Sequence, residues 1–219
     1  MTASAPAPVN VVFPNNAFIR FVAAAGNHSL AIGVNSDVVY AWGANDVGQL
    51  GLGTNKSAAY NSPELVSGLG QAVRGVAAGS RHAVVKLADD SVSCWGDGTS
   101  GQLGNGLTAS APAPVNVVFP NNAFIRFVAA AGNHSLAIGV NSDVVYAWGA
   151  NDVGQLGLGT NKSAAYNSPE LVSGLGQAVR GVAAGSRHAV VKLADDSVSC
   201  WGDGTSGQLG NGLTASAPA

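Results

Sequence analysis

The sequence is poor in charged and aromatic residues. Of its 219 residues, 10% are charged and 6% are aromatic, and the formal net charge is −2. The Lys and Arg residues are scattered along the chain instead of clustered, so the sequence offers no basic surface for a phosphate backbone. We therefore expect no nucleic-acid partner.

Long hydrophobic runs are also absent. One of the longest, at residues 18–25, is interrupted by Arg20, whereas a membrane-spanning helix needs about 20 apolar residues. No basic segment followed by an apolar one stands behind Met1, which predicts no secretion signal. We expect no membrane partner, and the sequence assigns no cellular compartment.

Helix signals are nearly missing, whereas glycine is abundant. The chain has 30 glycines, and 47% of its residues are hydrophobic, with Val, Ala and Leu in short runs. This pattern is typical of many short strands joined by tight turns around a sizeable core. The predicted fold class is all-β.

The most informative feature is an internal repeat without a single change. The segment from Thr2 to Leu107 recurs from Thr108 to Leu213, and a third copy begins at Thr214. Natural duplications diverge with time. The identity therefore indicates a recent amplification or a gene assembled deliberately from one unit.

Each copy contains two similar halves. A tryptophan and a Gly-Gln-Leu-Gly element recur every 53 residues, and one histidine precedes each tryptophan. Four homologous units of this length, each with four short strands, have the size of β-propeller blades. The repeated residues are Trp42, Trp95, Trp148 and Trp201, Gln49, Gln102, Gln155 and Gln208, and His28, His82, His134 and His188.

Short apolar runs bounded by turn residues define the predicted strands. They cover 19–24, 28–34, 38–42 and 63–66 in the first unit, and 73–78, 82–87, 92–95 and 114–118 in the second. A proline in each last strand predicts an outer edge, where no N–H is needed. The predicted blades span 18–66, 73–118, 124–172 and 179–219, the last completed by an outer strand at 7–12.

One ordered set of residues resembles a known repeat. A strand ending Ala77-Ala78-Gly79, then His82, Trp95-Gly96 and a Gly-Gln-Leu-Gly element is similar to the repeat of the regulator of chromosome condensation family, and all four units carry this set. The resemblance covers essentially the whole chain. It implies a β-propeller, typically of seven blades, that binds proteins on its loop-rich faces.

Four blades per chain differ from the family number. They can close alone at about 90° each, or two chains can share an eight-bladed ring at about 45° each. Because the family blade suits the shallower wedge, we favour an eight-bladed homodimer, with a closed four-bladed monomer as the alternative. The segment 7–12 should then complete the blade at 179–201, of its own chain or of a partner, by strand exchange.

We interpret the repeated residues as structural. One histidine per blade leaves the imidazoles too dispersed for a metal site, so each should bond backbone near a blade contact. The tryptophans should form the core between blades. In each Gly-Gln-Leu-Gly element, the glutamine should bond nearby backbone and the leucine should wedge between blades.

The two cysteines occupy equivalent places two blades apart. Cys94 and Cys200 are therefore expected to be free and largely buried. The resemblance implies that many extracellular relatives pair such a cysteine with one at the position of Val84 or Val190, a partner that is lost here.

Nothing in the sequence predicts an enzyme. The acid pairs at 89–90 and 195–196 lie in turns, where such residues are usually solvated. No serine has a nucleophile-elbow pattern, and we expect no catalytic residue, metal or cofactor.

Three functions remain, in this order. The first is a structural scaffold, engineered or recently amplified, without a selected activity. The second is a protein-interaction module, and the third is guanine-nucleotide exchange on a small GTPase, which the founding family member performs. The third ranks lowest because no insertion interrupts the repeat pattern.

Overall fold

Short antiparallel strands make up almost all of the regular structure. The computed structural model describes residues 7–53, 59–141, 143–159 and 165–217, and these form three four-stranded sheets and one three-stranded sheet. Short 3-10 turns, η1 (Pro14–Asn16) and η2 (Pro120–Asn122), precede the first and third sheets. Sheet 1 contains β1 (Ile19–Ala25), β2 (His28–Gly33), β3 (Val39–Gly43) and β4 (Tyr60–Leu65); sheet 2 contains β5 (Val73–Ala78), β6 (His82–Leu87), β7 (Val92–Gly96) and β8 (Ala111–Asn116); sheet 3 contains β9 (Ile125–Ala131), β10 (His134–Gly139), β11 (Val145–Gly149) and β12 (Tyr166–Leu171); sheet 4 contains β13 (Val179–Ala184), β14 (His188–Leu193) and β15 (Val198–Gly202).

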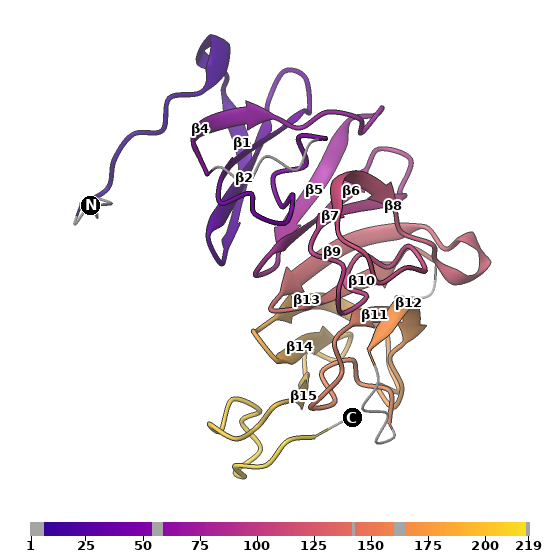
Figure 1. The fold of residues 1–219 in the computed structure, drawn as a ribbon. Helices are drawn as coiled ribbons and strands as arrows, with labels where there is room; N and C mark the ends of the chain where they lie inside the picture. Colours follow the sequence, from indigo (N-terminus) through magenta and orange to yellow (C-terminus); the bar gives the residue numbers. More distant parts are fainter. Residues whose placement is uncertain (1–6, 54–58, 142, 160–164, 218–219) are drawn as a thin grey trace.

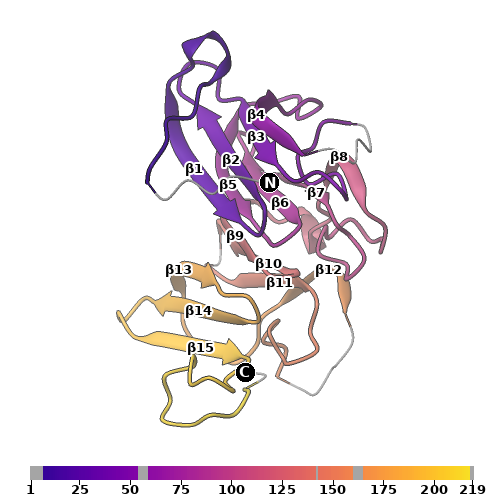
Figure 2. The same ribbon diagram turned by 60° about the vertical axis from the view of Figure 1, so that its left-hand side comes forward.

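The four sheets follow one another along an open arc (Figure 1). Within each sheet, strands consecutive in the chain are paired, so each sheet is a simple meander. The first strands of successive sheets, β1, β5, β9 and β13, are neighbours and connect the sheets along one side of the arc (Figure 2). Sheets 1 and 4 therefore form the two ends of the arc.

Aspartates in a left-handed conformation close the hairpins between the second and third strands. Asp37 and Asp90 have φ of 50° and 65°, and aspartate tolerates this region better than most residues with a side chain. In sheet 2 the turn is held by the Leu87 N–H, which donates to the Ser91 carbonyl at 2.9 Å. The copies Asp143 and Asp196 have φ of 49° and 67°.

The outer strands carry the prolines, as predicted. Pro63 lies in β4 and Pro114 in β8, each at the edge of its sheet, where a missing N–H removes no ladder bond. These strands begin earlier than predicted, since Ala111 at the start of β8 already pairs with Gly96. The inner strands β5 and β6 have the predicted bounds.

The hydrophobic core lies between the sheets. Side chains alternate along β6, so Ala83 and Val85 pack toward sheet 1 and Val84 packs toward sheet 3. Three clusters of buried residues result, one at each contact between neighbouring sheets. Each fully buried large side chain stabilises the fold by about 1.5–3 kcal/mol, so every inner sheet is stabilised from both faces.

The ends of the chain differ from the rest. In sheet 4 a single bridge between Gly202 and Ala217 follows the three strands. Residues 7–12, predicted as an outer strand, form no strand with the described part of their own chain. In Figure 1 this segment leads away from sheet 1.

The sheets pack closely at Gly104, so we expect a methyl group added there to lower the free energy of unfolding. Gly104 has φ +64°, and a Cβ there would lie 2.8 Å from Trp148 Nε1 of the next sheet. Gly106 has φ +83° with nothing within 4 Å. We expect Gly106→Ala to lower the free energy of unfolding by about 1 kcal/mol through backbone strain, and Gly104→Ala by about 2 kcal/mol more through overpacking. Urea denaturation measures both, and equal losses would contradict the packing.

Candidate interaction faces of the sheets

Each tryptophan after the first is bound by the preceding sheet. Trp95, Trp148 and Trp201 donate their indole N–H to the backbone carbonyls of Gln49, Gln102 and Gln155, each at 2.9 Å. These three rings are fully or almost fully buried. The predicted core position between blades is therefore where the structure places them.

Trp42 differs from its copies because no sheet precedes it among the described residues. Its ring is only partly buried. It packs edge-on against Phe13, with ring centroids 5.7 Å apart, just as Trp148 packs against Phe119 at 5.5 Å. Trp42 thus keeps its aromatic contact with Phe13. Within the part of the chain that the structure describes, it lacks the backbone carbonyl that a preceding sheet supplies to the other three tryptophans.

The Gly-Gln-Leu-Gly elements form the other half of each contact. Leu50, Leu103 and Leu156 are fully buried in the three clusters between sheets. Each glutamine closes its own loop, as where Gln49 Oε1 accepts the Val47 N–H at 3.0 Å. The glutamine thus orders the loop whose carbonyl accepts the tryptophan N–H.

The histidines lie between sheets, and His82 has a side-chain partner in place of the expected backbone contact. The Ser135 hydroxyl donates to the Gln102 carbonyl at 3.1 Å and lies 2.9 Å from His82 Nε2, so the imidazole N–H donates to the serine oxygen. The His28 and His134 side chains make no hydrogen bond of normal length among the residues described, but the backbone of His82 and of His188 lies near enough to favour their protonated forms slightly. In sheets 2 and 4, the position of Ser135 is occupied by Ala83 and Ala189, which have no hydroxyl to offer a histidine.

Burial keeps these imidazoles neutral. Desolvation lowers the pKa of His28 and of His134 to about 4. The pKa of His82 is lowered to about 3, mainly by desolvation and to a smaller extent by charge repulsion from His28 and His134. A buried neutral imidazole acts here as a packing group. Within the described segments, no cluster of three His, Cys, Asp or Glu residues could hold a metal ion.

Ion pairs mark the contact between sheets 1 and 2. Asp37 accepts hydrogen bonds from Arg20 at 3.0 Å and from Arg74 of sheet 2 at 2.7 Å, and Arg81 of sheet 2 pairs with Asp46. These partly exposed pairs contribute little individually, but they distinguish this contact. The same ion pairs recur between sheets 3 and 4, where the copies are Arg126, Asp143, Arg180, Asp152 and Arg187.

The contact between sheets 2 and 3 is of a different type. Asn133 and Thr99 replace the arginine and aspartate, and no ion pair between described residues joins these two sheets. The contact instead contains the histidine–serine hydrogen bond and a cluster with Cys94 and Phe119. Two contact types therefore alternate along the arc.

The two ends of the arc expose the two halves of this second type. On sheet 4, Val198 is 62% exposed, whereas its copy Val92 in sheet 2 is 1% exposed. On sheet 1, Val22 is 66% exposed, whereas its copy Val128 in sheet 3 is 5% exposed. The end faces carry the same residues as the buried contact between sheets 2 and 3.

The two cysteines also differ in burial between an inner sheet and an end sheet. Both are free thiols, but Cys94 is buried and Cys200 is only partly buried, which differs from the expectation that both are largely buried. Desolvation raises the pKa of both thiols. Cys94 lies opposite Val84 in the ladder, the position named for the missing cysteine partner.

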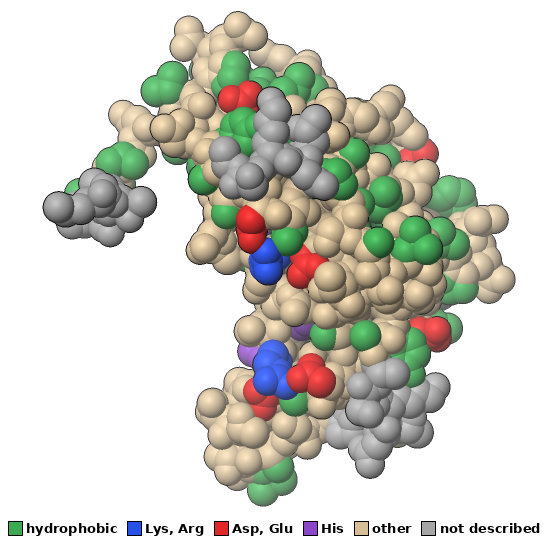
Figure 3. Space-filling model, viewed as in Figure 1, with side chains coloured by type: hydrophobic (Ala, Val, Ile, Leu, Met, Phe, Trp, Pro, Cys, Tyr) green, Lys and Arg blue, Asp and Glu red, His purple; other side chains and the backbone are tan. Residues whose placement is uncertain are grey.

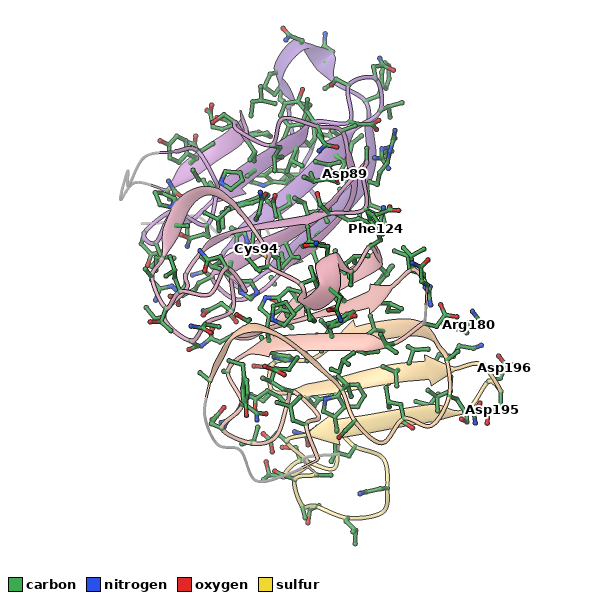
Figure 4. All side chains as sticks on the ribbon, turned by 90° about the vertical axis from the view of Figure 1, so that its right-hand side faces the viewer. Asp89, Cys94, Phe124, Arg180, Asp195 and Asp196 are labelled. Carbon is green, nitrogen blue, oxygen red and sulfur yellow. The ribbon has the colours of Figure 1, made fainter. Side chains whose placement is uncertain are left out.

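The acid pairs lie at the surface in turns. Asp89 Oδ1 accepts the Ser91 N–H and hydroxyl at 3.1 and 2.6 Å, and these bonds, with Gln71, lower its pKa to about 2. Asp195 and Asp196 lie at the tip of the β14–β15 hairpin (Figure 4). Asp89 and Asp195 stabilise their turns in the same way, since the Ser197 hydroxyl also donates to Asp195 Oδ1 at 2.6 Å.

The face of the molecule drawn in Figure 3 shows acidic and basic side chains close together. Hydrophobic side chains are scattered between polar atoms on this face. No helix among the described residues is long and apolar enough to cross a membrane.

Sequence reasoning missed the alternation of the contacts. The serine at position 135 and the phenylalanine at 119 carry no motif of their own. The signal was the comparison of the two halves of one repeat, where Ser29 and Ala83, or Asn27 and Arg81, occupy matching places.

Comparison with known families decides the relationship. The model described as "Regulator of chromosome condensation (RCC1) repeat" matches residues 36–85, 89–138 and 142–191, more than half of the chain. The chain belongs to the RCC1 repeat family. Each RCC1 match starts in or just before the third strand of one sheet and ends in the second strand of the next, so one sequence repeat bridges two blades.

Relatives and solved structures agree with this assignment. Human E3 ubiquitin-protein ligase HERC2 is 36% identical over 90% of this chain and 4% of its own length, and the Arabidopsis thaliana ultraviolet-B receptor UVR8 is 31% identical over 89% and 43%. The Saccharomyces cerevisiae protein Prp20p superposes with a TM-score of 0.81 at 23% identity, over 95% of this chain and 51% of its own. The fold is thus that of RCC1 propeller blades, and sheets 1–4 are called blades 1–4 below.

The buried histidines predict a pH-dependent stability. Their folded pKa values lie below that of an unfolded histidine, about 6.5, so the stabilisation is full above that value and is lost as the pH falls. Between pH 7 and 5 we expect about 2 kcal/mol of loss for each of His28, His82 and His134. Urea denaturation at both pH values measures it. His82→Gln should remove about a third of the change, and a flat profile would contradict neutral burial.

Proposed function

We propose that the chain is a protein-interaction module of the RCC1 type. The observation that supports this most directly is that, at the three contacts between blades, the repeated tryptophan and Gly-Gln-Leu-Gly residues are used for packing between blades, so other exposed residues are available for a partner. The chain spans only 4% to 43% of the curated relatives named above, so the ligase and receptor activities in their names are not carried over.

An apolar rim is the best candidate for the binding surface. Phe18 is 75% exposed and adjoins Val34, whose N–H donates to its carbonyl at 2.8 Å. Phe124 and Val140 repeat this pair on blade 3. Phe124 lines a shallow groove that also contains Asp89 (Figure 4). Exposed aromatic side chains beside a groove are typical anchors of protein interfaces.

A capture experiment tests this proposal. The immobilised chain should retain a protein that then binds saturably, with one partner per rim site, in a calorimetric titration. Phe18→Ser combined with Phe124→Ser should weaken that binding at least tenfold and leave the unfolding temperature unchanged, because both side chains are solvent-exposed. Undiminished binding by the double variant would contradict the rim as the site.

A structural role without a ligand is the second candidate. It is favoured by the unchanged recurrence of the 106 residues from Thr2 to Leu107, which begin again at Thr108. This gives both halves the same loops, as expected of a recently amplified or engineered scaffold. Guanine-nucleotide exchange ranks lowest. The structural neighbour Prp20p binds Gsp1p and histones, and accelerated release of a fluorescent nucleotide from a small GTPase by this chain would raise that rank.

We further propose that two copies close into an eight-bladed ring. This is supported by the end faces, because blade 4 repeats blade 2 and blade 1 repeats blade 3, so the contact between chains would copy the buried contact of blades 2 and 3. Light scattering should give a particle of about twice the 21.7 kDa chain mass. Since this contact type lacks ion pairs, 0.5 M salt should not dissociate it. A monomer at micromolar concentration would contradict the ring and favour four-bladed closure.

A further inference from the structure

We propose that residues 8–13 of one copy form the outer strand of blade 4 in a second copy, where they continue the strand that Ala217 begins. The outer strand of this blade would then be composed of two chains. The inference rests on the proposed ring and goes beyond it by assigning the segment to a second copy and by giving its register and the groove that it fills.

The start of the strand is already in place. The Ala217 N–H donates to the Gly202 carbonyl at 2.8 Å, and these two residues are paired. The pair repeats Ala111 and Gly96, with which β8 begins in blade 2. Blade 4 therefore sets the register of its own outer strand.

The rest of the edge of β15 has no strand beside it in the described residues. In blade 2, Cys94 pairs with Val115 and Ser93 with Asn116. The matching residues of β15, Cys200 and Ser199, pair only with β14. Unpaired N–H and carbonyl groups at such an edge favour the addition of a strand.

The sequence of the free segment is the one that the edge requires. Residues 214–219 followed by 8–13 repeat residues 108–119 without a change. In that register Val9 of the second copy lies opposite Cys200, as Val115 lies opposite Cys94. A one-residue slip would turn the apolar side chains to the wrong face.

An apolar groove on blade 4 matches the segment. Val190, Val198, Cys200 and Leu209 line it, and their copies in blade 2 belong to the cluster that buries Val117. Val117 is 8% exposed, whereas its copy Val11 is 45% exposed. Occupation of the groove by Val11 of a second copy would restore this cluster.

Phe13 holds the segment in a suitable position. Its ring packs edge-on against Tyr40 and Trp42 at 5.5 and 5.7 Å, as Phe119 packs against Tyr146 and Trp148. Within the chain, the residues before Phe119 form β8 of the preceding blade. The residues before Phe13 are thus held where a preceding blade would receive them.

A designed disulfide tests the register. In Val9→Cys, the new thiol should lie opposite Cys200 of the second copy, at a Cα separation of about 4.5–5.5 Å that suits a disulfide. Oxidised glutathione, which is reduced to two thiols as the protein disulfide forms, should convert most of the chain to a covalent dimer on a non-reducing gel. Dithiothreitol and the added substitution Cys200→Ser should each abolish this dimer.

Two matched variants control the experiment. Val115→Cys should form the same bond to Cys94 inside one chain, which shows that the ladder geometry permits it. Val12→Cys places a thiol at an exposed position, whose copy Val118 lies beyond the end of β8, and should give little covalent dimer.

The alternative outcomes overturn the inference in distinguishable ways. In the Val9→Cys variant, a disulfide from the new thiol to Cys200 of the same chain would mean that the chain closes on itself. A light-scattering dimer of Val9→Cys that does not cross-link, while Val115→Cys does, would leave the ring intact and reject the shared strand. A monomer with a freely reactive Cys200 would reject the ring itself.

Discussion

The contact between neighbouring blades is the interaction on which the rest of the structure depends. At each contact a tryptophan indole donates to the backbone carbonyl of a Gly-Gln-Leu-Gly glutamine, and the last glycine of that element lies too close to the ring for a Cβ. The leucine of the same element is buried beside it. One short loop thus supplies a hydrogen bond, a flat surface and an apolar anchor, which explains why these residue types recur together.

A chain built from such contacts is stabilised by nearest neighbours. Each inner blade has two contacts, whereas blades 1 and 4 have one each, and their uncovered faces hold residues that are buried elsewhere in the same molecule. The two contact types alternate, one with ion pairs and one without, so the end faces are not equivalent. They are the two complementary halves of the apolar type, which makes a second copy the best-matched partner for both.

Much of this could be predicted from the sequence. The period, the four-stranded units, the bounds of β5 and β6 and the family all follow from short apolar runs and recurrent residues, because these report local structure and repetition. The hydrogen bonds of the histidines could not be predicted. His82 lies 2.9 Å from the hydroxyl of Ser135, whereas the residue that matches Ser135 in sheet 2 is Ala83, which has no hydroxyl. The difference depends on which blades meet in space. The partial exposure of Cys200 likewise depends on a neighbouring blade.

In the proposed ring, Trp42 would be bound like the other three tryptophans, because a preceding blade would supply the acceptor carbonyl. Hydrogen exchange of the indole N–H groups, followed by ¹⁵N NMR on the intact chain at micromolar concentration, tests this most directly. We predict four indole protons that exchange slowly, since Gln208 of a second copy would accept the Trp42 N–H. Three slow protons and one that exchanges as fast as a solvent-exposed indole would contradict the central claim that the two ends of the arc form one blade contact.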